Sequence, residues 1–309
     1  MAEGCAAMVM TPATLRSKLH GVIAFPVTPF RDDLSLDIAA LKKNVRSLSA
    51  HPIAAIVAPG GTGELYSLTP PEHLDVVKGV VEEAGDVPVI AGVGFNGPAA
   101  AALARAAADA GASGILAFPP YYPSPEDDGI FDHYRGIADA TSLGVLIYSR
   151  DWFHPGPALV ERLASLPSLI AWKDGQGDIR RLQFLQARLG DRLLWIGGAG
   201  DDLVPAYYST GIRTFTSSIA NVAPALAVQL HEAASGSDRV TLERLMRQYV
   251  VPLYAFRARR RGYEVSVMKA LMNMLGLSGG RVRPPLVELP EEDLAELRTL
   301  AASWGYVQR

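Results

Sequence analysis

The chain repeats one hydrophobic pattern about eight times: a short apolar run that ends in glycine or polar residues, followed by a longer stretch with helical periodicity. This alternation predicts β-α units that share a parallel sheet. Eight units favour closure into a barrel over an open sheet, so we predict an α/β fold of the (β/α)8 TIM-barrel class. The expected strands are Gly21–Val27, Ile53–Ala58, Pro88–Val93, Ser113–Phe118, Leu143–Tyr148, Leu169–Lys173, Leu193–Gly197 and Arg213–Ser217.

Several helix starts between these runs are well marked. Asp37 is expected to cap a helix that begins at Ile38, and Thr69 offers an N-cap with a capping-box glutamate at Glu72. After Pro224 the strand pattern stops, and the remaining apolar periodicity predicts a C-terminal helical extension with helices at Val240–Gly262, Glu264–Leu275 and Pro290–Trp304. We therefore divide the chain into a weakly ordered tail (1–12), a catalytic barrel (13–235) and the extension (236–309), which is expected to form an oligomer or barrel-side surface.

Composition narrows the class of protein. A length of 309 residues with 49% hydrophobic residues suits one barrel with an appendage better than two independent domains. The net charge of -3 offers no general attraction to nucleic acid or anionic lipid, which favours a small-molecule partner. A single cysteine, Cys5, excludes disulfide frameworks and cysteine metal clusters. Because export and membrane-span patterns are also missing from the sequence, we expect a cytoplasmic protein.

Active sites of such barrels lie at the carboxyl ends of the strands, where this chain carries polar residues at four places. The four strand ends are Gly60–Glu64, Tyr148–Asp151, Lys173–Gly175 and Gly197–Asp202. Strand alternation puts Lys173 on one face with Ala171, and Ile170 on the other with Trp172. If the large pair faces the helices, Lys173 points into the barrel mouth. Burial there would lower its pKa from about 10.4 towards about 7–8, at a cost of roughly 4 kcal/mol, and make the amine a nucleophile.

Two further side chains extend this chemistry. Tyr148 is expected on the inner barrel face, where a phenol can shuttle protons, unless it is simply a core tyrosine. Arg150 is a candidate clamp for a substrate carboxylate, the alternative being a rim ion pair with Asp151. The glycines of Gly60–Glu64 let backbone amides approach a carboxylate, with the Thr62 hydroxyl beside them.

Other cofactor and partner classes receive no support. The glycine-rich Gly197–Gly200 does not match a nucleotide-binding pattern, and the histidines lack paired ligand spacing, so we expect no cofactor and no metal. A site that binds Mg²⁺ through carboxylates would leave no histidine pattern, so the histidine spacing argues only against metals held by histidine. The basic cluster Arg257, Arg259, Arg260 and Arg261 lies on a predicted helix. We expect it to form a solvated face or an interface rather than a nucleic-acid patch.

The ordered strand ends resemble those of the dihydrodipicolinate synthase and N-acetylneuraminate lyase superfamily of Schiff-base barrels across nearly the whole chain. Gly60–Glu64 is similar to its GTTGE carboxylate loop and Pro120–Tyr122 to its PYY loop, while Tyr148, Lys173 and Ala220–Pro224 match its strand-five tyrosine, its imine lysine and its segment after strand eight. The closest resemblance within the superfamily is to the 5-dehydro-4-deoxyglucarate dehydratases. It is carried by the loop, by Phe25–Thr28, by Tyr148–Asp151 and by Lys173–Gly175.

Two departures qualify the resemblance. Gly61 stands where dihydrodipicolinate synthases have a threonine of a tyrosine–threonine–tyrosine proton relay, which weakens the synthase interpretation. Ser149 stands where an asparagine is expected after the tyrosine. By resemblance, Tyr122 would reach the site of a neighbouring subunit, so a homodimer or homotetramer is expected.

The resemblance implies loss of water and CO₂ from 5-dehydro-4-deoxy-D-glucarate, a keto sugar diacid, to give 2,5-dioxopentanoate. Lys173 would condense with the C5 ketone and Tyr148 would carry protons. The expected substrate-binding residues are Gly61, Thr62, Gly63, Arg150, Gly198, Ser217 and Ser218. Arg150 and the two serines are candidates for the distal end of the diacid, and the sequence leaves open how C6 is released.

Three alternatives remain at this stage. A class I retro-aldolase acting on a 2-keto-3-deoxy sugar acid needs the same lysine and tyrosine. A dihydrodipicolinate synthase-like condensing enzyme would also use them. A non-catalytic barrel could bind keto acids as a sensor or regulatory subunit. Analysis of the products and covalent trapping of Lys173 distinguish these functions.

Overall fold

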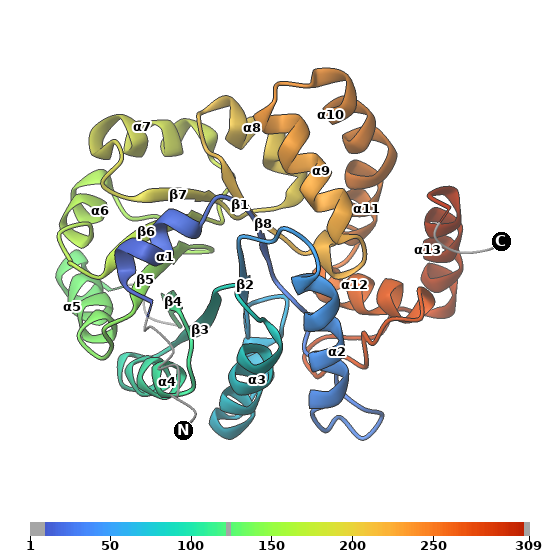
Figure 1. The fold of residues 1–309 in the computed structure, drawn as a ribbon, viewed down its shortest axis with the longest axis horizontal. Helices are drawn as coiled ribbons and strands as arrows, with labels where there is room; N and C mark the ends of the chain where they lie inside the picture. The colour runs from blue at the N-terminus through green and yellow to red at the C-terminus, as the bar shows by residue number, and fades with distance from the viewer. Residues whose placement is uncertain (1–9, 122–124, 306–309) are drawn as a thin grey trace, which may run out of the picture.

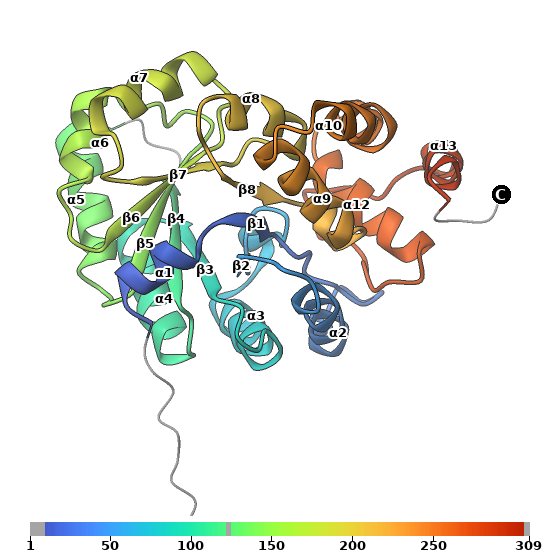
Figure 2. The same cartoon turned by 45° about the horizontal axis from the view of Figure 1, so that its top comes forward.

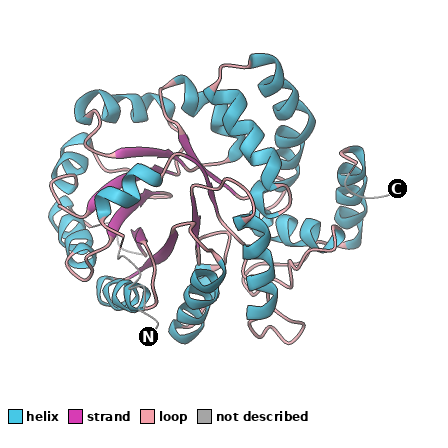
Figure 3. Cartoon of the chain, viewed as in Figure 1, coloured by secondary structure: helices cyan, strands magenta, loops and turns pink. Residues whose placement is uncertain are grey.

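Eight parallel strands close into a barrel in sequence order, with β1 paired to β8. The computed structural model describes residues 10–121 and 125–305. The strands are β1 (Gly21–Ala24), β2 (Ala55–Val57), β3 (Val89–Phe95), β4 (Gly114–Pro120), β5 (Gly144–Ser149), β6 (Leu169–Asp174), β7 (Leu194–Gly197) and β8 (Thr214–Ser217). Figure 3 shows them as an inner ring of strands surrounded by helices. The predicted fold class and all eight predicted strands are confirmed, with β1 and β2 shorter than expected.

Helices follow the strands and cover the outside of the barrel (Figure 1). Those that precede or accompany the barrel are α1 (Pro12–Lys18), α2 (Ile38–Ser49), α3 (Pro70–Glu83), α4 (Gly97–Asp109), α5 (Asp127–Ala138), α6 (Pro157–Leu163), α7 (Ile179–Leu189), α8 (Val204–Ser209) and α9 (Pro224–Ser235). Short 3₁₀ turns lie at η1 (Leu65–Ser67), η2 (Asp201–Leu203) and η3 (Ile219–Asn221). The predicted caps are confirmed, because the Asp37 side chain accepts from the backbone of α2 and Thr69 with Glu72 forms a capping box on α3.

The core has two layers. Inward-facing strand residues such as Ile90 and Leu116 form one buried cluster inside the barrel, and outward-facing residues such as Val89 and Ile115 pack with the helices in a second. Leu15 of α1 and Leu19, which follows the helix as its C-cap, belong to the inner cluster, so α1 covers one end of the barrel, as Figure 2 shows. A Cβ at Gly114, the first residue of β4, would lie 2.4 Å from a terminal methyl of Leu15, so a larger residue there would displace this side chain at the amino-terminal end of the barrel.

The start of α1 differs from the expected tail. Thr11 caps this helix and Pro12 is its first residue, so residues 11 and 12 are already part of an ordered element. Residues 1–9 lie outside the described residues. The division into a barrel (13–235) and an extension (236–309) stays a prediction.

The C-terminal extension comprises α10 (Arg239–Leu245), a π-helical turn η4 (Met246–Val250), α11 (Val251–Arg257), α12 (Tyr263–Met274) and α13 (Glu291–Ser303). The single helix predicted over Val240–Gly262 is therefore interrupted. Pro252 has no N–H, so the carbonyl of Gln248 four residues earlier loses its helical donor, and the indole of Trp304 donates to it at 2.9 Å. In Figure 1, α13 projects furthest from the barrel.

Candidate active site

A cavity of about 610 Å³ opens at the carboxyl ends of the strands. Its walls come from residues at or just after seven of the eight strands and from the C-terminal extension. The strand-end residues include Phe25, Gly61, Thr62, Phe118, Tyr148, Arg150, Lys173, Gly198, Ser217 and Ser218. The extension contributes Tyr254, Arg257, Ala258, Gly262, Glu264, Val265 and Leu286.

Lys173 lies near the end of β6 with its amine inside this cavity. The side chain is only 3% exposed, and Nζ donates to the Gly198 carbonyl at 2.9 Å. Burial lowers the pKa of Lys173 from 10.5 to about 8 and outweighs the opposing effect of nearby Tyr148. A measurable fraction of the amine is therefore neutral near pH 7, as a nucleophile requires.

The inward direction of Lys173 follows from strand alternation, with one irregularity. Lys173 and Ala171 share the inner face, and Trp172 belongs to the outer core, as expected. Ile170, however, lies in the inner cluster rather than against the helices. The register explains this, because Val145 pairs with Leu169 whereas Leu146 pairs with Ala171, which leaves Ile170 as an extra, bulged residue.

Tyr148 lies on β5, next to Lys173 on β6. The two residues are register partners, and Nζ lies 3.3 Å from the centroid of the phenol ring. Tyr148 is 3% exposed, and an Arg150 guanidinium nitrogen donates to its hydroxyl at 3.0 Å. Although burial acts in the opposite direction, the positive charges of Lys173 and Arg150 lower the pKa of Tyr148 below its usual value of 10.0. This phenol is thus easier to deprotonate than a free tyrosine.

Arg150 makes both of the contacts considered from the sequence. One nitrogen binds the Tyr148 hydroxyl, and Nε lies 3.4 Å from an Asp151 carboxylate oxygen. Its side chain is 47% exposed. Arg150 therefore acts on the phenol and also forms a rim ion pair.

The Gly60–Glu64 loop brings part of the predicted carboxylate site to the cavity. Gly61 and Thr62 line it, whereas Gly63 is buried below and its carbonyl accepts from the Thr28 hydroxyl at 2.7 Å. Glu64 turns away from the cavity, is fully buried and forms an ion pair with Lys269 of α12. One of its carboxylate oxygens also accepts from the backbone of Arg283 at 2.9 Å, so the loop is anchored to the extension.

The strand-seven and strand-eight residues line another part of the cavity. Gly198 places its carbonyl on Lys173, and a Cβ at this position would lie 2.5 Å from Lys173 Cγ. The Ser217 hydroxyl is hydrogen-bonded to Asp201, and Ser218 Oγ accepts from Arg257 at 2.9 Å. Tyr122, the remaining predicted residue, lies outside the described residues.

Arg257 is the main residue that the sequence interpretation placed wrongly. Arg259 and Arg260 are exposed and lie near acidic residues of α13, as a solvated face or interface would require. Arg257, in contrast, is 8% exposed and lines the cavity. Helical spacing could have indicated this, because Leu253, four residues earlier on the same face, is buried in the core.

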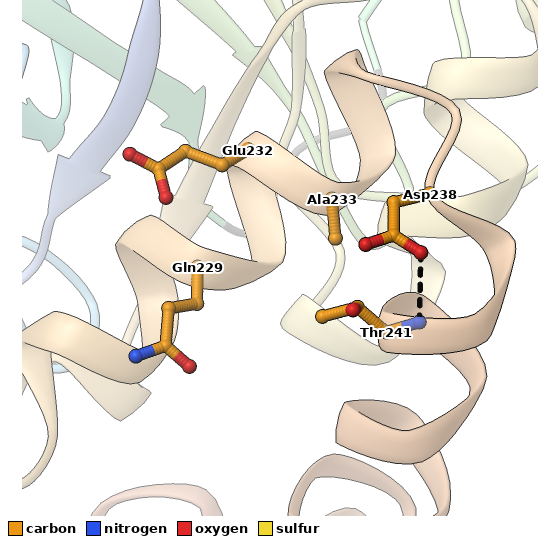
Figure 4. Close-up of a pocket in the computed structure, with 5 residues that line it drawn as sticks. All are labelled: Gln229, Glu232, Ala233, Asp238 and Thr241. Atoms are coloured by element: carbon orange, nitrogen blue, oxygen red, sulfur yellow. Dashed lines mark hydrogen bonds between the residues drawn. The ribbon is translucent and has the colours of Figure 1, made fainter.

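Within residues 10–121 and 125–305, no group of three or more His, Cys, Asp or Glu side chains is arranged to hold a metal ion. Over the same residues, no helix is both long enough and apolar enough to cross a membrane. Figure 4 shows a second hollow, lined by residues of α9 and α10, in which Asp238 caps the backbone of Thr241. This carboxylate already accepts a hydrogen bond as the N-cap of α10.

The chain is similar to known proteins over nearly its whole length. Residues 18–303 match the model of the dihydrodipicolinate synthetase family. The chain is 39% identical over 296 residues to a Bradyrhizobium diazoefficiens protein named "probable 5-dehydro-4-deoxyglucarate dehydratase", with 94% of each chain covered. A Methylobacterium radiotolerans protein of the same name is 41% identical over 300 residues, covering 94% of this chain and 97% of that protein. The crystal structure of dihydrodipicolinate synthase from Bacillus clausii superposes with a TM-score of 0.89 at 29% identity, covering 94% of this chain and 99% of that one.

Proposed function

Because the chain belongs to the dihydrodipicolinate synthetase family, we propose that it is a Schiff-base lyase that converts 5-dehydro-4-deoxy-D-glucarate into 2,5-dioxopentanoate, water and CO₂. One observation carries the proposal: a buried amine with a pKa of about 8 lies against a phenol whose own pKa is lowered. The names of the relatives supply the substrate. No step needs a metal or an organic cofactor, because the imine itself accepts the electrons.

Imine formation is the first step. The neutral Lys173 amine attacks the C5 ketone, and the resulting carbinolamine loses its hydroxyl as water. Tyr148 is positioned to donate a proton to this hydroxyl and to receive one from the nitrogen, since its ring lies 3.3 Å from Nζ. Arg150 stabilises the phenolate that forms between these transfers, because its guanidinium donates to the phenol oxygen.

Dehydration follows from the electron-withdrawing iminium. Loss of a proton from C4 gives an enamine, and its electrons expel the C3 hydroxyl as water once that oxygen is protonated. The product is an iminium conjugated to a C3–C4 double bond. Tyr148 is the proposed carrier for both protons, because the positive charges of Lys173 and Arg150 lower the pKa of its phenol and so favour the phenolate.

The conjugated iminium also determines which carboxylate can leave. Cleavage of the C1–C2 bond sends its electron pair through C3 and C4 to the imine nitrogen and releases CO₂. The dienamine that remains carries an enol at C2, which becomes the aldehyde after proton transfer, and hydrolysis of the imine restores the ketone and frees Lys173. A carboxylate at C6, bonded to the iminium carbon itself, has no such electron sink. We therefore assign CO₂ to C1 rather than to C6, the carbon considered from the sequence alone.

The C6 carboxylate beside the ketone is assigned to the loop after β2. Thr62 and the backbone of Gly61 line the cavity and offer a hydroxyl and amides. Gly63 supports this loop from below rather than facing the substrate. Gly198 orients the lysine, and we assign Ser217 and Ser218, which also line the cavity, to the distal end of the substrate.

Product analysis tests the reaction. Incubation with 5-dehydro-4-deoxyglucarate should release CO₂ and 2,5-dioxopentanoate, and substrate labelled with ¹³C at C1 should give labelled CO₂. Pyruvate with a three-carbon aldehyde would instead establish the retro-aldolase alternative. Borohydride reduction during turnover should add the substrate mass at Lys173, and Lys173→Ala should lose both the adduct and the activity. An active Lys173→Ala variant would refute the imine mechanism.

The assembly and location are also proposals. We propose a homodimer or homotetramer on the family resemblance, with support from exposed aromatic residues near the strand ends, among them Tyr66 at 46% and Phe95 at 37% exposure. Light scattering after size exclusion would test this, and a monomeric mass at micromolar concentration would contradict it. A cytoplasmic location suits a chain with one cysteine in 309 residues.

A further inference from the structure

Arg257 is a buried cation without a directly bound anion. Within the described parts of the chain, no carboxylate oxygen lies within the 4.0 Å ion-pair distance of its guanidinium, although Asp201 and Asp202 act on it electrostatically from further away. Its Nε is buried without a hydrogen-bond partner. The side chain is 8% exposed and faces the cavity that holds Lys173. A buried charge is normally paired, because removal from water otherwise costs several kcal/mol. The missing partner is therefore expected to be an anion that enters the cavity.

The guanidinium is held in place before any ligand arrives. One terminal nitrogen donates to Ser218 Oγ at 2.9 Å, and the guanidinium carbon lies 4.5 Å from the centroid of the Tyr254 ring. The Tyr254 hydroxyl in turn donates to the Asp201 carboxylate at 2.8 Å. This chain of contacts ties α11 to the end of β8 and presents the planar fork of Arg257 to the cavity.

Two other groups considered for the distal carboxylate are already engaged. Arg150 donates to Tyr148, lies near Asp151 and is 47% exposed. Ser217 is bound to Asp201. Arg257 thus keeps more unused donors than either of them.

We propose that Arg257, together with Ser218, binds the distal C1 carboxylate of the keto diacid and makes the site selective for diacids over monoacids. The inference rests on the proposed function, since that function supplies a second carboxylate. It also gives the C-terminal extension a role in recognition, because the cations that the barrel brings to the cavity are otherwise occupied: Lys173 is the imine-forming amine, and Arg150 contacts Tyr148 and Asp151. An arginine at this point fixes the C1–C2 bond relative to the imine plane and so positions the bond that breaks.

Two keto acids of equal length test this recognition without requiring turnover. 2-Oxoadipate has the six-carbon keto diacid skeleton, and 2-oxohexanoate lacks only the distal carboxylate. Each forms an imine that borohydride traps on Lys173, so the concentration for half-maximal trapping can be measured for both. Wild-type protein should trap 2-oxoadipate at lower concentration than 2-oxohexanoate.

Arg257→Met is the informative variant, since it keeps an unbranched apolar stem and removes the charge. We expect the concentration for half-maximal trapping of 2-oxoadipate to rise about 10- to 100-fold, as loss of charge-assisted hydrogen bonds implies, and that of 2-oxohexanoate to change less than about twofold. Arg257→Lys should recover part of the preference. Arg259→Met is the matched control, because Arg259 is 44% exposed, pairs with Glu296 and does not line the cavity.

The outcomes separate the two proposals. An unchanged preference for 2-oxoadipate in Arg257→Met would overturn the inference and leave the proposed function intact. Equal weakening of both acids would also overturn it, because the arginine would then serve only the fold. Failure of wild-type protein to trap either acid would overturn the Schiff-base function itself.

Discussion

Replacing Lys173 by methionine should abolish turnover and stabilise the folded protein. The amine is 3% exposed, and burial holds its pKa at about 8 instead of 10.5. That difference corresponds to roughly 3 kcal/mol of native-state destabilisation while the amine is charged in both states. Methionine fills nearly the same volume without a charge. The methionine variant also loses the hydrogen bond to the Gly198 carbonyl, which offsets about 1 kcal/mol of the stability gained by removing the charge.

The net gain at pH 7 is therefore about 2 kcal/mol. For a chain of 309 residues this corresponds to a rise in Tm of about 3 °C. The sign of the pH dependence follows from the lowered pKa. Below pH 8 both folded and unfolded chains carry the proton and the destabilisation is complete. Between pH 8 and 10.5 the folded protein has lost the proton that the unfolded chain still binds, so the wild type gains stability as pH rises.

Urea denaturation of wild type and Lys173→Met at pH 7 and pH 10 measures this difference. The advantage of the variant should shrink at pH 10, where less than about 1 kcal/mol of the destabilisation remains. Lys78→Met is the control, because Lys78 is exposed on α3 and its replacement should change stability by less than about 0.5 kcal/mol at either pH. A Lys173→Met protein that is less stable than wild type at pH 7 would refute the conclusion that burial of the charged Lys173 amine destabilises the folded protein.

Three further predictions concern the same framework. Below pH 8 the rate of borohydride trapping with a keto acid should rise about tenfold per pH unit and level off above it, as the pKa of about 8 for Lys173 requires; a rate that keeps rising to pH 10 would contradict that value. Gly198→Ala should reduce trapping at least about tenfold, because its Cβ would lie 2.5 Å from Lys173 Cγ. Gly136→Ala is the control, because Gly136 is exposed on α5, does not line the cavity and has nothing within 4 Å of an added Cβ, so trapping should stay nearly unchanged. Similar effects of the two substitutions on trapping would argue against the geometry. Glu64→Gln should lower the free energy of unfolding by about 3–5 kcal/mol in urea denaturation, since it leaves the buried Lys269 charge unpaired, and a loss below about 1 kcal/mol would count against that ion pair.

The hydrophobic pattern by itself determined the fold class and the location of the reactive pair. Eight apolar runs separated by helical stretches can bury their surfaces most simply as a closed parallel barrel. In such a barrel all strands end at one rim, and neighbouring strands bring Tyr148 and Lys173 together with no further information. The inward direction of both side chains followed from the two-residue repeat of a strand.

Only the tertiary structure decided the features that depend on contacts between distant segments. The bulge at Ile170 arises from the pairing of β5 with β6, which no local pattern records. The placement of Gly63 below the loop depends on Thr28, which lies 35 positions earlier in the chain. Arg257 was assigned to a solvated cluster because its neighbours are charged, yet α11 packs over the barrel mouth and turns this residue inward. Local patterns report the periodicity of one element, whereas the free energy of packing one element on another selects which face is buried.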